Sequence, residues 1–276
     1  MKKAKIAYAA WPWGLESKKQ LIQALTDLKR IGFNNFESVC KTIELFDYDV
    51  REFTSIIKTA GVQPVSFYFY QTNDTENDLN RIKKSIDFLT ASKIKNISIQ
   101  AAYKENGGAT ESELNNVLSY LEGVGRLCKP YAILPSLHPH TNTMVMYENE
   151  IDFIMERTDP DLIYFGPDTA HLTAGHCNAV SIFKRYAERI RFVHLKDVKK
   201  NKKSDADNSK QGFEIYSNFL ELGEGDVDIP GCLKVLENTE YDGFLTIELD
   251  KSRFSNIKSA EMNKAYMEKN GYSLKS

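Results

Sequence analysis

All five histidines of this 276-residue chain lie between His138 and His194, each at or just beyond a short apolar run. The chain reads His138-Pro139-His140, then Asp168-Thr169-Ala170-His171 with His176 after it, then His194-Leu195-Lys196-Asp197. A further apolar run, 243–247, ends in Glu248. Imidazole and carboxylate together suit a divalent cation such as Zn, Mn, Fe or Co better than Ca²⁺, which prefers oxygen alone. The pattern indicates side chains that converge on one site from the ends of successive strands.

The elements that must position these residues alternate along the chain. Short apolar runs, several of them hydrophobic at every position as in strands covered on both faces, predict strands at Lys5–Ala10, Asn35–Val39, Val62–Tyr70, Asn96–Ala101, Ala132–Leu137, Leu162–Gly166, Ile190–Leu195 and Phe244–Leu249. Amphipathic periodicity predicts helices at Lys18–Ile31, Asp78–Leu89, Glu111–Cys128, Glu148–Glu156, Asn178–Ala187 and Pro230–Asn238. Eight strands separated by helices predict an α/β fold, a (β/α)₈ TIM barrel, for which about 250 residues is typical.

The same pattern predicts one domain over residues 1–276, because no linker or break in composition divides the chain. We expect Ser252–Ser276 to pack outside the barrel as a helix or tail, with a homo-oligomer contact as one role for it. The connection Lys199–Gly225 is unusually long, and long connections usually have a function. On the strand-end face of a barrel it would lie over the pocket, which favours a lid or a partner contact.

Composition excludes several classes of protein. A hydrophobic content of 42% and a charged content of 27% are those of a soluble globular protein. The formal net charge of −2 argues against a nucleic-acid binder or an anionic-membrane binder. The four cysteines form no C-x-x-C pair, and no run approaches the ~20 apolar residues of a membrane span. We therefore expect a reduced, cytoplasmic protein.

In a parallel barrel the loops after the strand ends build the active site. His138, Asp168, His194 and Glu248 fall at the ends of the fifth to eighth predicted strands, at spacings of 30, 26 and 54 residues. Each residue alone has an ordinary structural explanation, such as a buried histidine bonded to backbone or an aspartate capping a helix. Four ligand-competent side chains in a row at one end predict a cation site.

Four motifs resemble the xylose-isomerase-like sugar phosphate isomerase/epimerase superfamily of TIM barrels, namely Asp-Thr-Ala-His-Leu (168–172), His-Leu-Lys-Asp-Val (194–198), Gly-Glu-Gly-Asp-Val-Asp (223–228) and Tyr-Asp-Gly-Phe-Leu-Thr-Ile-Glu-Leu-Asp (241–250). Within it, the stretch from His138 to Asp250 most resembles the inosose (2-keto-myo-inositol) dehydratase branch. Its features here are the His-x-His at 138–140, Thr-Asp-Pro at 158–160 and the lengthened connection after His-Leu-Lys-Asp. The resemblance implies one divalent cation (Mn, Co, Zn, Fe or Mg, with Mn or Co favoured) held by His138, Asp168, His194 and Glu248.

One departure from the family pattern bears on the reaction. Ketose epimerases of the superfamily carry a glutamate on strand five and pair it with the strand-eight glutamate as acid and base on opposite faces of the substrate. This chain has His138 at that position. A symmetric epimerisation that uses two glutamates is therefore disfavoured, and a reaction of the dehydratase type is favoured.

Catalytic roles are expected for three residues. Glu248 or a histidine is the base that removes a proton next to the substrate carbonyl. The resemblance makes His171 a substrate-contacting or proton-transfer group, and its alternative role is a hydrogen bond to a neighbouring loop. His140 lies two residues after His138 and faces the same way if the strand continues; a catalytic and a structural role both remain open.

Substrate contacts are expected from three more residues. Glu37, at the end of the second strand, is a plausible ligand of a substrate hydroxyl. Lys196 can hold a substrate oxygen, or can pair with a carboxylate at the barrel rim. Trp13 gives an apolar wall, unless it packs in the core. Gly223-Glu224-Gly225 superficially resembles a phosphate cradle but lacks the strand, helix and lysine context, so a turn leading into Pro230 is favoured.

The function predicted from the sequence is a metal-dependent lyase that removes an α-proton and water from a keto-sugar or keto-inositol. The alternatives are a ketose epimerase or isomerase on a free or phosphorylated sugar, an endonuclease IV-like DNA-repair enzyme with three zinc ions, and a non-catalytic sugar-binding barrel. The expected partner is a small carbohydrate, with no nucleic acid and no membrane.

Overall fold

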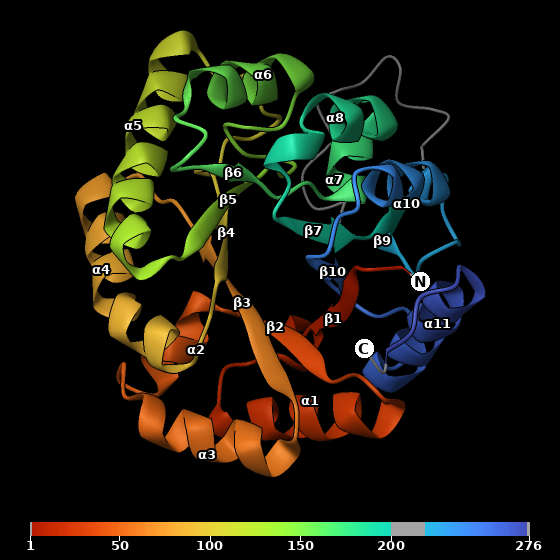
Figure 1. The fold of residues 1–276 in the computed structure, drawn as a ribbon. Helices are drawn as coiled ribbons and strands as arrows, with labels where there is room; N and C mark the ends of the chain where they lie inside the picture. The colour runs from red at the N-terminus through yellow and green to blue at the C-terminus, as the bar shows by residue number, and fades with distance from the viewer. Residues whose placement is uncertain (1, 200–218, 275–276) are drawn as a thin grey trace.

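The computed structural model describes residues 2–199 and 219–274, which form a barrel of parallel strands surrounded by helices (Figure 1). The strands of the barrel are β1 (Lys5–Ala9), β2 (Asn35–Val39), β3 (Gln63–Tyr70), β4 (Asn96–Gln100), β5 (Leu134–His138), β6 (Tyr164–Phe165), β7 (Phe192–Leu195) and β10 (Phe244–Ile247). They lie in the order β6-β5-β4-β3-β2-β1-β10-β7. Parallel bridges Phe165–Ile190 and Asp168–His194 join β6 to β7 and close the ring. The predicted (β/α)₈ fold is confirmed.

The helices lie outside the ring and mostly begin and end where the sequence signals them. They are α1 (Lys18–Ile31), α2 (Cys40–Leu45), α3 (Val50–Ala60), α4 (Thr75–Ala91), α5 (Glu111–Cys128), α6 (Glu148–Arg157), α7 (Thr169–Ala174), α8 (Ala179–Arg185), α10 (Ile229–Asn238) and α11 (Asn256–Lys269). Ser17 accepts a hydrogen bond from Gln20 N at the start of α1, and Gly32 ends that helix with a φ of 113°. The helices α2, α3 and α7 were not among those predicted.

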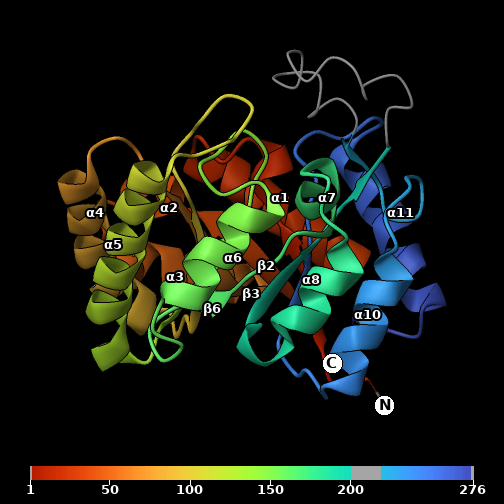
Figure 2. The same ribbon diagram turned by 90° about the horizontal axis from the view of Figure 1, so that it is seen from above.

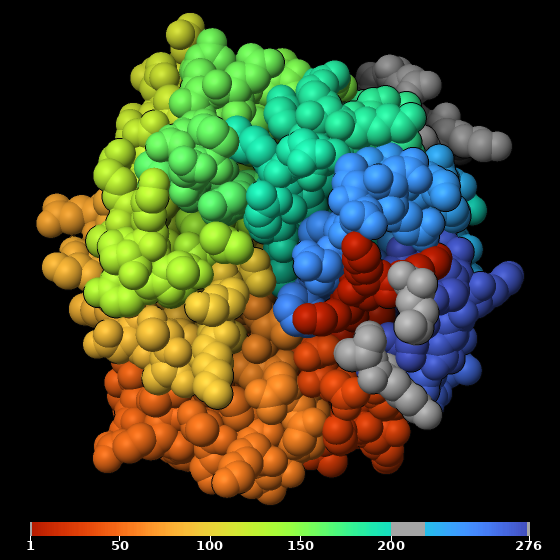
Figure 3. All heavy atoms as spheres, in the orientation of Figure 1, coloured from red at the N-terminus to blue at the C-terminus, as the bar shows by residue number. Residues whose placement is uncertain are grey.

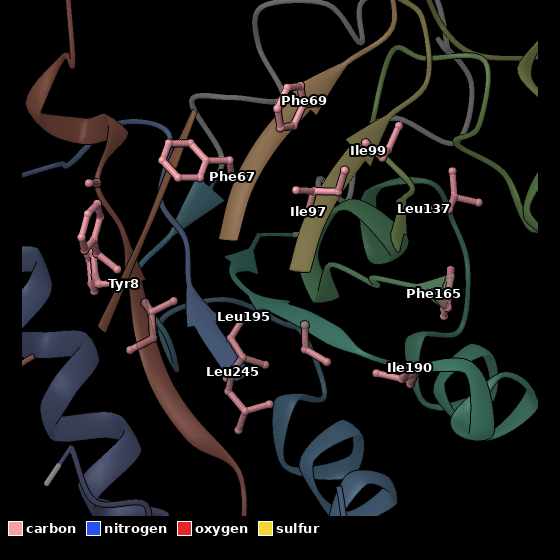
Figure 4. Packing of buried hydrophobic residues seen from close by; sticks show 14 of the residues in the cluster. Tyr8, Phe67, Phe69, Ile97, Ile99, Leu137, Phe165, Ile190, Leu195 and Leu245 are labelled. Atoms are coloured by element: carbon pink, nitrogen blue, oxygen red, sulfur yellow. The ribbon is translucent and has the colours of Figure 1, made fainter. Parts of the chain in front are cut away.

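Residues on each strand alternate between the helices and the barrel interior. The outer set packs against the helices in one continuous apolar core, part of which Figure 4 shows, and includes Tyr8, Phe67, Phe69, Ile97, Ile99, Leu137, Phe165, Leu195 and Leu245. Tyr8, for example, bonds through its hydroxyl to Asn263 of α11. The inner set is polar at mid-height, with Glu37, Ser66, Ser98, Ser136, His194 and Thr246 all buried. This interior leads directly to the carboxyl ends of the strands.

The amino end of the barrel is closed by a small apolar cluster. Ala7, Val65 and Phe192 are buried there, and Phe244 packs against them. Both ends of the chain lie at this end of the molecule (Figure 2). Figure 3 shows the first residues (red) beside the segment of α10 and β10 (light blue), where Lys3 pairs with Glu240 at 3.0 Å.

The C-terminal segment packs outside the barrel, as expected. Helix α11 contacts α1, and Asn263 also accepts a hydrogen bond from Leu222 N at 2.7 Å. None of the helices among the described residues is both long and apolar enough to cross a membrane.

The connection after β7 is fixed by a buried carboxylate. Asp197 begins β8 (Asp197–Val198), which pairs antiparallel with β9 (Phe219–Leu220). Its carboxylate accepts hydrogen bonds from the backbone amides of Val198, Gly223, Gly225 and Val227 at 2.8 to 3.1 Å. The Gly-Glu-Gly segment therefore encloses an anion, but that anion is the chain's own Asp197. The lid predicted for Lys199–Gly225 falls mostly on residues 200–218, outside the described residues.

Gly225→Ala tests this enclosure. A Cβ at Gly225 would lie 2.1 Å from Asp197 Oδ1 and 2.6 Å from the Val198 carbonyl oxygen, so the loop must move off the carboxylate. We expect a loss of about 1–3 kcal/mol in the free energy of unfolding, measured in urea. The control is Gly123→Ala, where a Cβ meets only the end of the Leu79 side chain and gains about 1 kcal/mol of helix propensity. Equal stabilities of the two variants would contradict the enclosure.

Candidate active site

The structure brings the four predicted cation ligands to one end of the barrel. His138 ends β5, His194 lies in β7, Asp168 follows β6 and Glu248 follows β10, and all four are buried. Ligand atoms of His138, His194 and Glu248 lie within 4.8 Å of one another, and so do those of Asp168, His171 and Glu248. Glu248 belongs to both groups. A third group of the same kind joins His138, His140 and His171.

His194 stands at the centre of this cluster. Its Nε2 lies 2.5 Å from Glu37 Oε2 and its Nδ1 lies 3.0 Å from His138 Nδ1. Burial lowers the pKa of His194, but the carboxylates of Glu37 and Glu248 outweigh it and raise the pKa to about 9. Burial holds the pKa of His138 well below its usual value, so His138 is neutral. In the metal-free protein the proton on His194 Nδ1 is donated to His138.

The two carboxylate oxygens of Asp168 have different surroundings. Oδ1 accepts hydrogen bonds from Ala170 N at 2.8 Å and His171 N at 2.7 Å, which caps α7. Oδ2 is buried and has no hydrogen-bond partner among the described residues. Burial raises the pKa of Asp168 to about 7, against the opposing effect of Lys196.

Lys196 is fully buried, and each N–H of its ammonium group has an acceptor. Its Nζ pairs with Glu248 Oε1, lies 2.9 Å from Asp250 Oδ2 and lies 3.0 Å from His171 Nε2. An ammonium group has three donors, so these three acceptors occupy all of them. Burial lowers the pKa of Lys196, but Asp250 and Glu248 outweigh it and raise the pKa, which keeps the lysine charged. The geometry matches pairing with rim carboxylates rather than a free substrate contact.

The two remaining histidines of the cluster, His140 and His171, are neutral and lie against each other. The rings of His140 and His171 lie 3.7 Å apart, and burial lowers the pKa of both, that of His140 to about 4. His140 Nδ1 donates to the Thr141 carbonyl oxygen at 2.7 Å. His171 Nδ1 lies 3.0 Å from Thr141 Oγ1. Charged Lys196 donates to His171 Nε2 at 3.0 Å, and Thr141 N donates to His171 Nδ1 at 3.3 Å.

The substrate contacts predicted in the first half of the chain are placed differently. Glu37 is buried, and its oxygens contact Ser66, Ser98 and His194, so neither faces an open pocket. Trp13 donates its indole N–H to Asp27 of α1 at 3.0 Å. The tryptophan that neighbours the cluster is Trp11, whose ring lies 6.2 Å from that of His194.

Sequence reasoning missed two contributors to the site, Trp11 and Asp250. Trp11 and Tyr68 pack together at 5.7 Å, and Tyr68 meets the His138 ring edge-on at 5.2 Å. Asp250 pairs with Lys196, and its place two residues after Glu248 was the signal for it, because alternate residues share a face of a strand. His176 takes no part in the cation-type groups found among the described residues.

The donor set fits a divalent cation. Within the described chain, His138 Nε2, Asp168 Oδ2 and Glu248 Oε2 are buried polar atoms without a hydrogen-bond partner. Unsatisfied buried atoms of this kind are costly and uncommon. Here they belong to three of the four predicted ligands and combine nitrogen with oxygen, the mixture that Mn²⁺, Co²⁺, Fe²⁺ and Zn²⁺ accept. His194 Nδ1 would supply the fourth donor once its proton is lost.

A closed parallel barrel with imidazole and carboxylate side chains at the carboxyl ends of its strands defines the general class of this protein, a TIM barrel. The model of the xylose isomerase-like TIM barrel family matches residues 25–269. The chain belongs to this family, as its motifs predicted.

Curated relatives and solved structures agree with this assignment. An inosose dehydratase of Clostridium perfringens is 32% identical over 144 residues, which are 51% of this chain and 48% of that protein. This alignment therefore spans about half the length of that relative. An inosose dehydratase of Clostridium botulinum (strain Alaska E43) is 29% identical over 247 residues, 83% of this chain and 82% of that protein. The fold is similar to that of the IolI protein with a bound zinc atom, with a TM-score of 0.76 and 15% identity over 96% of this chain and 97% of that chain.

The pKa shifts predict how cation binding depends on pH. A cation on Asp168 and His194 must displace protons from groups whose pKa values are about 7 and about 9. Binding of Mn²⁺ should therefore release protons and tighten as the pH rises from about 6 to about 8. Calorimetry in buffers of different ionisation enthalpy measures both effects. An affinity that is constant over this range would contradict the assigned ligands.

Proposed function

We propose that this protein is a divalent-metal-dependent lyase that eliminates water from a 2-keto polyol of the inosose kind. The observation that carries the proposal is a continuous line of hydrogen bonds beside the cation ligands, from Glu248 through Lys196 to His171. Such a line links a base to an acid, which is what elimination of water requires. A ketose epimerase or isomerase remains the alternative.

His138, Asp168, His194 and Glu248 would hold the cation, with Mn²⁺ or Co²⁺ favoured over Zn²⁺, Fe²⁺ and Mg²⁺. When bound, the cation stabilises negative charge on the oxygen of a carbonyl group as a proton leaves the neighbouring carbon. Zinc is bound in the structure of the similar IolI protein, which supports a cation in this fold.

The protein's own residues then remove a proton from the α-carbon and deliver a proton to the departing hydroxyl. Glu248 takes the α-proton through Oε1, the oxygen that pairs with Lys196, while Oε2 is the oxygen that would contact the cation. Lys196 passes a proton to His171 Nε2 at 3.0 Å and is recharged by Glu248. His171, or His140 stacked on it, gives a proton to the departing hydroxyl. A C–H bond and a C–O bond break and a C=C bond forms; the histidine's proton leaves with the hydroxyl as water, and the α-proton replaces the proton that Lys196 gave up.

The arrangement of carboxylates favours elimination over epimerisation. Epimerisation needs a base on each face of the substrate, and the strand-five position that supplies the second carboxylate in epimerases of the superfamily is here neutral His138. Glu248 and Asp250 both follow β10 and therefore lie on one side of the barrel. The inosose dehydratases among the relatives support the same choice.

The other two alternatives have less support. A DNA-repair endonuclease needs an extended basic face, and the net charge of −2 supplies none overall. A non-catalytic sugar-binding barrel has no need of the buried, unsatisfied donor atoms of Asp168 and Glu248. A small carbohydrate is therefore the proposed partner.

An NMR assay in D₂O tests the reaction. Protein loaded with Mn²⁺ and then freed of excess metal is incubated with inosose and, separately, with ketohexoses. We expect loss of water from inosose and little C3 deuteration of the ketohexoses, and chelator-treated protein should lose the activity. Rapid C3 deuteration with epimer formation, and no dehydration of inosose, would instead establish the epimerase alternative.

A further inference from the structure

We propose that Glu37 is a positioning residue that fixes the ring of His194, so that Nδ1 is the atom presented to the cation. This inference rests on the proposed function, because it concerns the same site. Glu37 lies on β2 and His194 on β7, strands that β1 and β10 separate in the ring. Their contact of 2.5 Å therefore crosses the barrel interior, where both side chains are fully buried.

Glu37 is itself held in place by its neighbours. Ser66 Oγ of β3 and Ser98 Oγ of β4 donate to Oε1 at 2.8 and 3.0 Å. The two hydroxyls occupy Oε1 and leave Oε2 directed at His194. Three successive strands thus fix one carboxylate, and this accounts for small polar residues at inward positions where a barrel core usually has branched apolar ones.

The consequence for His194 is a defined tautomer. A carboxylate only accepts hydrogen bonds, so Nε2 must carry its proton toward Glu37. Nδ1 is then the nitrogen that would lose its proton to bind the cation; in the metal-free protein it donates to His138 Nδ1 at 3.0 Å. Without Glu37 either nitrogen can hold the proton, and the ring can turn its protonated nitrogen toward the cation. A carboxylate that orients a metal-binding histidine typically improves affinity about 10- to 100-fold.

Cobalt affinity measured by competition with a chelator tests the positioning role. Glu37→Ala removes the acceptor and should weaken Co²⁺ binding by about 10- to 100-fold. Glu37→Gln keeps an acceptor without the charge and should fall between this variant and the wild type. The Ser66→Ala/Ser98→Ala double variant keeps Glu37 but removes the two hydroxyls that donate to its Oε1. It should also weaken Co²⁺ binding. The matched control is Ser38→Ala on β2, because Ser38 is buried and its hydroxyl bonds to Thr42 Oγ1 at 2.8 Å.

A second readout separates this inference from the proposed function. In the metal-free protein the His194 Nε2 proton should give a strongly downfield NMR signal that is present in the wild type and Ser38→Ala and absent in Glu37→Ala. Wild-type protein that shows this signal but binds no Co²⁺ would reject the cation site and keep the Glu37 contact. An absent signal in the wild type, or equal Co²⁺ affinity for folded Glu37→Gln, the double serine variant and the wild type, would overturn the positioning role.

Discussion

The buried contact between Glu37 and His194 is the constraint around which the site is built. Removing a carboxylate from water is costly unless charge and hydrogen bonds replace the water. Glu37 has two serine hydroxyls and one imidazole for this purpose. The imidazole can carry a positive charge only as a protonated ring, or share one through a cation on its other nitrogen. The fold therefore keeps a place for either a proton or a metal ion at His194 Nδ1.

The balance of charge around this contact favours the metal ion. Four carboxylates, those of Glu37, Asp168, Glu248 and Asp250, meet one charged lysine and one charged histidine within the cluster. In the metal-free protein the excess is relieved by raised pKa values, that of Asp168 to about 7 and that of His194 to about 9. A bound divalent cation would offset this excess negative charge without the uptake of protons. The opposite side of the barrel contributes few charges and instead supplies hydroxyls and the aromatic rings of Trp11 and Tyr68.

Much of this arrangement follows from the sequence, because strand ends in a parallel barrel share one face. Apolar runs located His138, Asp168, His194 and Glu248 at those ends without any knowledge of contacts. The role of Glu37 did not follow, since its partner lies across the barrel and depends on register; the β2–β3 pairing shifts between Phe36 and Glu37. The saturation of Lys196 by three acceptors, and the choice of Trp11 over Trp13, depend likewise on side-chain directions that spacing does not determine. Helices α2 and α3 were not predicted, and they are separated by a turn in which Asp47 and Tyr48 have positive φ.

The most direct test of a single cation in the barrel is anomalous diffraction from crystals grown with Co²⁺. The account predicts one strong peak in contact with His138, Asp168, His194 and Glu248, with His194 bound through Nδ1 and its Nε2 still on Glu37. A peak shared by His138, His140 and His171, or a barrel with no peak at saturating Co²⁺, would contradict it.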